Sequence, residues 1–132
     1  MALLVDTNVI IDVVTADPQW AEWSLQRLEA LASEGLSVNP VIFAELCYDC
    51  ATVGEAESIV RQMGFAYLET PRDGLFRAAR AFADYRRAGG SRNSVLPDFF
   101  IGGHAEASGL RILTRDVARY RTYFPKVELI AP

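Results

Sequence analysis

The stretch LLVDTNVIID, residues 3–12, is the first guide to the fold class, and it places one carboxylate between two apolar runs. Residues 2–5 (ALLV) are typical of a short buried strand, and a helix is expected to begin at Thr7 or Asn8. Asp6 therefore stands where a strand gives way to a helix. A buried carboxylate is costly unless a hydrogen bond or a cation compensates it. This junction is the first candidate for a functional site.

The rest of the chain alternates short apolar strands with longer helical stretches. We predict strands over residues 36–38, 65–69, 111–114 and 126–130, and helices over 18–34, 39–50, 54–63, 72–87 and 97–108, with a short helix from Asp116. This alternation is typical of an α/β fold, in which helices cover both faces of a parallel sheet. We find no linker or repeat, so residues 1–132 are expected to form one domain.

Composition excludes several classes of protein. With 51% hydrophobic residues the chain is not expected to be disordered, and no apolar run approaches the ~20 residues that span a membrane. No basic segment with an apolar signal core stands at the start, so a cytoplasmic location is expected. The net charge of −4 argues against nucleic-acid binding by bulk charge. All the cations except Lys126 are arginines, which suit bidentate phosphate contacts.

Four acids interrupt apolar sequence. Asp6 follows the first strand directly, and Asp116 lies just beyond the strand at 111–114, so both should project from the same edge of a parallel sheet. Glu45 shares a helical face with apolar neighbours and is expected to point inward. Asp98 falls in the first turn of its helix, where the helix dipole favours an anion.

These acids need compensation that the neighbouring sequence does not supply. No Lys or Arg stands near Asp6, Glu45 or Asp98. Mg²⁺ and Mn²⁺ prefer carboxylate oxygens, and a metal held by several acids can support phosphodiester hydrolysis. Taken singly, each acid has a plain alternative as a helix cap, a dipole partner or a solvated residue. Together, four acids in apolar surroundings favour a metal site.

The cysteines and the histidine are expected to have structural roles. Cys47 and Cys50 form a CxxC late in a predicted helix, whereas a redox motif would lie where a strand meets a helix start. A zinc site would need two further ligands, and His104 is the only other nitrogen or sulfur candidate. We therefore expect two reduced cysteines in or near the core. His104 is expected to be a packing or surface residue, because it does not share a helical face with Asp98.

Three further residues have open interpretations. Asp12 is expected to be a solvated helix residue. Trp20 and Trp23 lie on the border of the polar and apolar faces of their helix, which favours core packing. The alternative is a groove for a partner helix, because aromatic residues are enriched at binding hot spots.

The chain resembles the PIN-domain ribonucleases, and in particular the VapC-type toxins of bacterial toxin–antitoxin pairs. The matching stretches lie between residues 5 and 125 and are VDTNVIID, VIFAEL, LPDFFIGGHA, ILTRD and ARYRTYFP. The resemblance implies a PIN-like α/β/α sandwich with a central parallel sheet and an acidic pocket at its C-terminal edge. It also implies Mg²⁺- or Mn²⁺-dependent RNA cleavage, a homodimer and a cognate antitoxin.

The resemblance assigns roles to individual residues. By position, the metal-binding acids would be Asp6, Glu45, Asp98 and Asp116, with support from Thr7, Asn8 and Thr114. Many relatives carry a second acid or an Asn near the fourth acid. This chain has a single acid there, flanked by Arg115. Direct or water-mediated contact of that acid with metal, and one or two metal ions, both remain open.

Five arginines are candidates for RNA contact. Arg115 and Arg119 are spaced i, i+4 beside the fourth acid, where they would clamp phosphate. Arg86, Arg87 and Arg92 flank a Gly-Gly pair in a basic loop that would grip a flexible strand. The alternative for all of them is a solvated surface with ion pairs to nearby acids.

Other acidic-pocket proteins match the sequence less well. A receiver-type signalling module needs a lysine near the pocket, and Lys126 lies close to the C-terminus. A haloacid-dehalogenase-like phosphatase would need a second Asp where this chain has Asn8. A catalytically inactive PIN-like module that acts in binding is the remaining alternative, and the presence of all four acids argues against it.

Overall fold

The computed structural model describes residues 2–132, which form a five-stranded sheet in the order β3-β2-β1-β4-β5. The central strand β1 (Leu3–Val5) lies between β2 (Leu36–Val38) and β4 (Arg111–Leu113), and the edges are β3 (Ala66–Tyr67) and β5 (Leu129–Ile130). All four strand pairs are parallel. The predicted α/β class is confirmed, and every strand presents its carboxyl end at the same edge.

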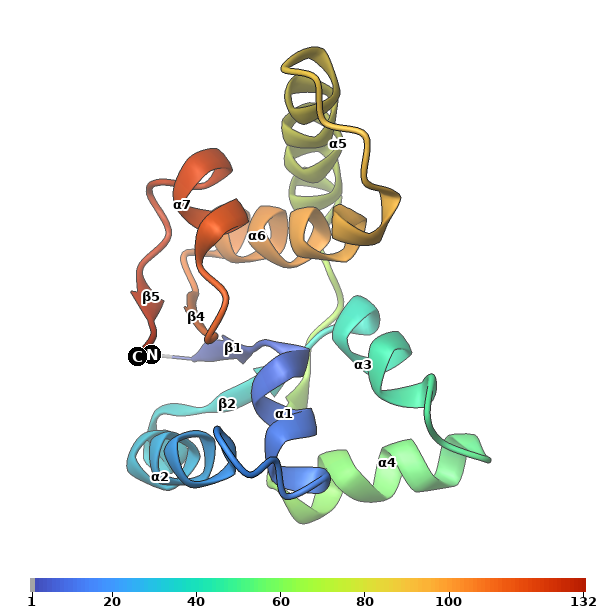
Figure 1. The fold of residues 1–132 in the computed structure, drawn as a ribbon, viewed down its shortest axis with the longest axis vertical. Coiled ribbons are helices and arrows are strands. Elements are labelled where there is room, and N and C mark those ends of the chain that lie inside the picture. Colours follow the sequence, from blue (N-terminus) through green and yellow to red (C-terminus); the bar gives the residue numbers. More distant parts are fainter. Residues whose placement is uncertain (1) are drawn as a thin grey trace.

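Helices cover both faces of this sheet. They are α1 (Thr7–Val14), α2 (Ala21–Leu31), α3 (Pro40–Cys47), α4 (Val53–Gln62), α5 (Arg72–Arg87), α6 (Leu96–Ser108) and α7 (Ala118–Tyr123), with 3₁₀ turns at Ala32–Glu34 and Asn93–Val95. Figure 1 shows α1, α2 and α4 on one face and α6 and α7 on the other, with α5 extending away from α6. The arrangement is the α/β/α sandwich expected from the sequence.

The core is built from the central strands and from α6. All three residues of β1 are fully buried, as expected of a strand with helices on both faces. Helix α6 contributes Phe99, whose ring contacts Phe82 and Tyr85 of α5 and Tyr123 of α7 at centroid distances of 5.2–5.5 Å. This aromatic cluster fixes α5 and α7 against the helix that carries Asp98.

A close crossing of α5 and α6 depends on glycine. A Cβ built on Gly103 would lie 2.4 Å from the carbonyl oxygen of Gly74 and 2.9 Å from the backbone nitrogen of Ala78. Backbone atoms cannot give way as the end of a flexible side chain can. The absence of a side chain at Gly103 therefore lets the two helices pack at this distance.

Several element boundaries differ from the predictions. The helix predicted from residue 18 begins at Ala21, because Asp17 Oδ1 accepts the backbone N–H groups of Gln19 and Trp20 and holds the preceding residues in a turn. The short C-terminal helix begins at Ala118, two residues after Asp116. The strands predicted over 65–69 and 126–130 are each reduced to two residues at the sheet edges. No helix in the described part of the chain is long and apolar enough to cross a membrane.

Candidate acidic active site

Asp6 is fixed at the junction of β1 and α1. Its backbone N–H donates to the carbonyl of Leu113 in β4 at 2.9 Å, which extends the sheet pairing by one residue. Its side chain caps α1, with Oδ1 accepting the backbone N–H of Thr7 at 2.8 Å. Only 4% of Asp6 is exposed. The acid that interrupts the apolar sequence therefore lies at the carboxyl edge of the sheet, in a conformation set by rigid elements.

The second carboxylate oxygen of Asp6 accepts three side-chain hydrogen bonds. Asp6 Oδ2 lies 2.8 Å from Thr114 Oγ1, 2.9 Å from the Tyr120 hydroxyl and 3.3 Å from Asn8 Nδ2. These donors favour the ionised form, but burial outweighs them and raises the pKa of Asp6, and the nearby charge of Asp116 adds to this rise. Asp6 is thus a buried acid whose charge lacks full compensation from the protein.

Glu45 approaches from α3. Asn39 starts this helix, because its side chain accepts the backbone N–H of Ile42 at 2.9 Å. Glu45 then turns toward the first acid, and the Thr7 hydroxyl donates to Glu45 Oε1 at 2.6 Å. Burial raises the pKa of Glu45, and the charge of Asp6 contributes to the rise. The inward orientation expected for Glu45 is the one observed.

Asp98 and Asp116 complete the acidic group. Asp98 lies in the first turn of α6, and its pKa is raised to about 7, first by burial and then by the charges of Asp6, Asp116 and Glu45. Asp116 is exposed on the loop after β4, where its backbone N–H donates to Thr114 Oγ1 at 3.1 Å. The structure thus brings together the four acids singled out in the sequence.

Tyr120 is a site residue that sequence reasoning missed. It is 1% exposed, its hydroxyl donates to Asp6, and burial together with the nearby acids raises its pKa well above the usual value. The sequence carries one signal for it, an aromatic residue between two arginines in a short helix. Its partner lies 114 positions away, so the hydrogen bond itself could not be predicted.

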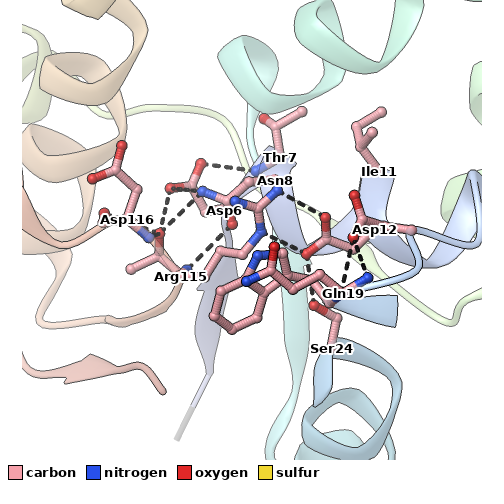
Figure 2. Close-up of polar contacts among 12 residues, drawn as sticks. Asp6, Thr7, Asn8, Ile11, Asp12, Gln19, Ser24, Arg115 and Asp116 are labelled. Atoms are coloured by element: carbon pink, nitrogen blue, oxygen red, sulfur yellow. Dashed lines mark hydrogen bonds and ion pairs between the residues drawn. The ribbon is translucent and has the colours of Figure 1, made fainter. Parts of the chain in front are cut away.

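Asp12 corrects an expectation, because it is buried at 1% exposure and not solvated. It forms a bidentate ion pair with Arg115, with distances of 2.8 Å to Nε and 2.9 Å to Nη2, and it accepts the Ser24 hydroxyl at 2.9 Å. Figure 2 shows Arg115 between this acid and the side chains of Asp6 and Asp116. The backbone N–H of Arg115 also donates to Asn8 Oδ1 at 3.3 Å, so the loop is tied to α1.

This ion pair changes the interpretation of Arg115. The sequence suggested that its guanidinium would clamp phosphate. In the structure the guanidinium pairs with Asp12, and its central carbon lies 5.5 Å from the centre of the Trp20 ring. Trp20 is therefore half-buried against an arginine, and Trp23 packs on the core and contacts Trp20 edge to face at 6.2 Å. The core packing expected of both tryptophans is observed for Trp23, whereas Trp20 stacks against Arg115.

The other four arginines differ in their surroundings. Arg87 forms an ion pair with Asp84, and Arg86 donates to Asn93. Both are exposed, as is Arg92. Arg119 is partly buried on α7 and close enough to Asp98 for its charge to lower the pKa of that carboxyl.

The histidine and the cysteines lie apart from this chemistry. His104 is 2% exposed, its Nδ1 lies 3.2 Å from Asn39 Nδ2, and burial lowers its pKa. This is the packing role expected for it. Cys47 and Cys50 are unpaired and partly buried, and the thiol of Cys50 contacts the carbonyl of Leu46 at 3.2 Å.

An apolar groove of about 640 Å³ opens beside the acids. It runs between α1, α3 and the start of α6, and Thr7 and Glu45 form its polar end. The remaining lining residues are Ile11, Pro40, Val41, Ala44, Tyr48, Asp49, Leu96, Pro97 and Phe100. Tyr48 is 88% exposed, so the far end of the groove is open to solvent.

The donor set fits a hard divalent cation in kind and in charge. Carboxylate oxygens are the preferred ligands of Mg²⁺ and Mn²⁺. Burial raises the pKa of Asp98, and the charges of Asp6, Asp116 and Glu45 raise it further. Residues 2–132 contain no group of three acidic, histidine or cysteine side chains already arranged to hold an ion. Both oxygens of Asp6 and one of Glu45 are engaged by protein donors. Asp6 Oδ1 accepts a single hydrogen bond and Glu45 Oε2 accepts none among the described residues, so lone pairs on both carboxylates remain for an ion.

Comparison with known proteins identifies the family. The family model for the PIN domain matches residues 3–125 of this chain. The chain belongs to the PIN-domain family. No curated protein sequence matches it significantly.

Solved structures share the fold of this PIN domain at low sequence identity. VapBC2 from Rickettsia felis, bound to a DNA fragment from its promoter, aligns with a TM-score of 0.76 at 17% identity and covers 100% of this chain and 99% of its own. DNA-bound VapBC from Salmonella typhimurium gives 0.73 at 18% identity, covering 99% and 98%. FitAcB from Neisseria gonorrhoeae gives 0.68 at 20%, covering 98% and 96%. At these identities the likeness shows a common fold.

Proposed function

We propose that this PIN domain is a Mg²⁺- or Mn²⁺-dependent endoribonuclease that hydrolyses RNA phosphodiester bonds. The observation that carries the proposal is the group of four carboxyls at one sheet edge, where Asp6, Glu45 and Asp116 help raise the pKa of Asp98 to about 7. A divalent cation bound among these carboxyls would offset the repulsion between their charges. Membership of the PIN-domain family supports nuclease activity in general. That the substrate is RNA and that a divalent metal is required are the more specific parts of the proposal.

Each side chain has a proposed task. Asp6, Asp98, Asp116 and Glu45 would hold the metal, which when bound activates water and stabilises the charge of the leaving oxygen. Thr114 and Tyr120 fix Asp6 through hydrogen bonds to Oδ2. Thr7 fixes Glu45, and Asn8 links Asp6 to the loop that carries Asp116. These neutral donors orient the carboxylates without competing for the metal with another charge.

We further propose that the chain is a VapC-type toxin inhibited by a cognate antitoxin. Several of the similar structures are VapBC or toxin–antitoxin complexes, which supports a protein partner of this kind. The apolar groove beside Glu45 supplies a surface that such a partner would cover. Replacing Val41 with Asp in that groove should weaken antitoxin binding and leave RNA cleavage by the free protein in place. Loss of cleavage with retained antitoxin binding would contradict this assignment of the groove.

A homodimer and a cytoplasmic location complete the proposal. Leu75 and Phe76 are 42% and 60% exposed on α5, and a second copy would bury such apolar side chains. Light scattering on the purified protein should give twice the mass of one chain. A monomer at all concentrations would remove this part of the proposal and leave the nuclease assignment intact.

Cleavage assays test the central proposal. Purified protein should degrade a structured RNA with Mg²⁺ or Mn²⁺, and a chelator should stop the reaction. Asp98→Asn should lose cleavage by at least 100-fold while circular dichroism shows an intact fold. Asp49→Asn is a matched control, because Asp49 is exposed at the rim of the groove and no hydrogen bond or ion pair joins it to the four acids in the described part of the chain. Full activity of Asp98→Asn, or cleavage that persists in chelator, would refute the metal-site assignment.

A further inference from the structure

Arg119 has an unusual set of surroundings for a partly buried cation. Its Nε is the one buried side-chain nitrogen or oxygen among residues 2–132 that has no hydrogen-bond partner. No ion pair within 4.0 Å is formed by this residue in the described chain either. A buried donor left without a partner costs free energy. Nε itself is buried, but the terminal Nη groups of Arg119 also make no hydrogen bond in the described part of the chain, so these donors remain for a ligand.

Tyr85 holds this guanidinium in one place. The central carbon of the Arg119 guanidinium lies 5.4 Å from the centre of the Tyr85 ring. Tyr85 is itself 8% exposed and packs against Phe99 at 5.5 Å, and its hydroxyl accepts the backbone N–H of Arg92 at 3.1 Å. Stacking on an aromatic face fixes the plane of an arginine while leaving its N–H groups free. Arg119 is thus oriented before any ligand binds.

The position of Arg119 limits what that ligand can be. Its charge reaches Asp98, yet neither Asp98 nor the other acids neutralise it through an ion pair. A cation would be repelled, and a neutral group would leave the charge uncompensated. An anion with two or more oxygens matches the fork of N–H donors, and a phosphodiester is such an anion.

The other arginines near the acids are less available. Arg115 is engaged by Asp12 and Arg87 by Asp84. Arg86 stacks 5.0 Å from the Phe82 ring centre and donates to Asn93, so it lies farther along the same aromatic surface of α5. Phe82 and Tyr85 stack at 5.8 Å, which joins the two arginine positions into one surface.

We propose that Arg119, oriented by Tyr85, binds a phosphate of the RNA strand directly beside the four carboxylates. This inference rests on the proposed ribonuclease function and selects one arginine among five candidates. Arg119 reduces the repulsion between the acids and the incoming strand at the point where it is greatest. Arg115 acts inside the protein, where it holds the loop of Asp116.

Binding assays in chelator separate this role from catalysis. The probe is a fluorescein-labelled, single-stranded oligoribonucleotide of mixed sequence, and the readout is fluorescence anisotropy over a range of salt concentrations. Arg119→Met should weaken binding about tenfold and reduce the slope of log K against log salt by about 0.7, the value for one phosphate contact to a single strand. Arg119→Lys keeps the positive charge but loses the paired N–H donors of the guanidinium. The slope of log K against log salt should therefore match that of the wild type, and the affinity for RNA should lie between those of the wild type and Arg119→Met.

Arg121→Met is the matched control. Arg121 lies two residues along the same helix, is exposed, and its replacement changes the net charge equally. It should change RNA affinity less than twofold. Equal losses for the Arg119 and Arg121 variants would show a general charge effect and overturn the inference. If the wild type binds and cleaves RNA while Arg119→Met keeps its affinity, only this inference fails; if the wild type neither binds nor cleaves RNA, the proposed function fails.

Discussion

Arg115 and Asp12, 103 positions apart in the sequence, form a bidentate ion pair at 2.8 and 2.9 Å. The carboxylate is almost fully buried in α1, and the guanidinium belongs to the loop that follows β4. Asp116 is the next residue of that loop. The pair therefore anchors the fourth acid of the site to the same helix that Asp6 caps.

Removing the cation of this pair should destabilise the protein. Arg115→Met leaves the Asp12 carboxylate buried with only the Ser24 hydroxyl as a side-chain partner. Breaking a pair of this kind costs about 2–4 kcal/mol, because an uncompensated charge remains in the interior. Urea unfolding with circular dichroism measures the change in the free energy of unfolding.

A double variant identifies the cause of this loss. Adding Asp12→Asn to Arg115→Met removes the stranded charge and should recover about half of the lost stability. Arg121→Met, an exposed arginine nearby in sequence, should change the free energy of unfolding by less than about 0.5 kcal/mol. A loss below that value for Arg115→Met would contradict the anchoring role.

The close approach of α5 and α6 gives a second prediction. Gly103→Ala would place a Cβ 2.4 Å from the carbonyl oxygen of Gly74, so the helices must separate. We expect a loss of about 2–3 kcal/mol, as for other overpacked interiors, and weaker cleavage because α6 carries Asp98. Thermal unfolding measures the effect.

Gly54→Ala is the matched control for this substitution. Gly54 also lies in a helix, and its nearest neighbour to a new Cβ is the Thr52 hydroxyl at 3.7 Å, an ordinary contact. Alanine should stabilise this helix by about 0.5–1 kcal/mol. A melting temperature for Gly103→Ala at or above that of Gly54→Ala would show that the crossing tolerates a side chain.

The raised pKa of Asp98 predicts a pH dependence of stability without metal. Its ordinary value is 3.8 and its value in the fold is about 7, so between these limits the native state binds the proton more tightly than the unfolded state. The free energy of unfolding should therefore fall as the pH rises from about 4 to about 7. Burial raises the pKa of Asp6 and Glu45 as well, which adds to the same trend.

Asp98→Asn should remove the part of this pH dependence of the free energy of unfolding that comes from Asp98. In chelator at pH 8 the variant should melt several degrees above the wild type, because it lacks the buried Asp98 charge that the neighbouring acids repel. At pH 5 the difference should be clearly smaller, and it should vanish only near pH 4, where Asp98 is protonated in both the native and the unfolded state. Equal differences at both pH values would show that the gain does not come from the carboxylate charge.

Added metal should make the wild type more stable than Asp98→Asn. Mn²⁺ stabilises the native state by binding to it, and protons compete for the same carboxylates. The melting temperature of the wild type should therefore rise more on addition of Mn²⁺ at pH 8 than at pH 6. Asp98→Asn should show little rise at either pH. A rise that is independent of pH and kept in the variant would place the metal elsewhere.

The sequence predicted the four acids because each depends on local pattern and topology. Asp6 and Asp116 follow strands, and the carboxyl ends of parallel strands must lie at one edge. Glu45 lies on an inward helical face and Asp98 in a first turn, both of which short-range spacing determines. Residue types and strand order therefore sufficed to place the four acids near one another.

The partners of these acids could not be predicted in the same way. Asp12 has the spacing of an ordinary helix residue, and its burial depends on Arg115, which only the tertiary fold brings near. Tyr120 lies in an arginine-rich helix, and its bond to Asp6 depends on the packing of α7 against the sheet. The predicted start of a helix was wrong where a side chain bound backbone N–H groups ahead of it, as Asp17 does by accepting those of Gln19 and Trp20 in a turn.

Tyr120 offers the most direct test of how the protein tunes its central acid. Its hydroxyl donates to Asp6 Oδ2 at 2.9 Å and favours the ionised carboxylate. Tyr120→Phe keeps the buried ring and removes this donor, so the pKa of Asp6 should rise further. We expect kcat/KM for RNA cleavage to fall about three- to tenfold at pH 7 and the acidic limb of the pH profile to move to higher pH. The free energy of unfolding should fall by about 1 kcal/mol.

Tyr123→Phe on the same helix is the control, because Tyr123 packs through its ring against Phe99 and Tyr85. Its pH profile should match that of the wild type. A loss of activity in Tyr120→Phe that is equal at every pH would indicate a packing defect, since protonation of Asp6 should impair metal binding only on the acidic side. A rate that recovers at pH 8.5 in Tyr120→Phe, and only there, would establish that the hydroxyl acts by keeping Asp6 ionised.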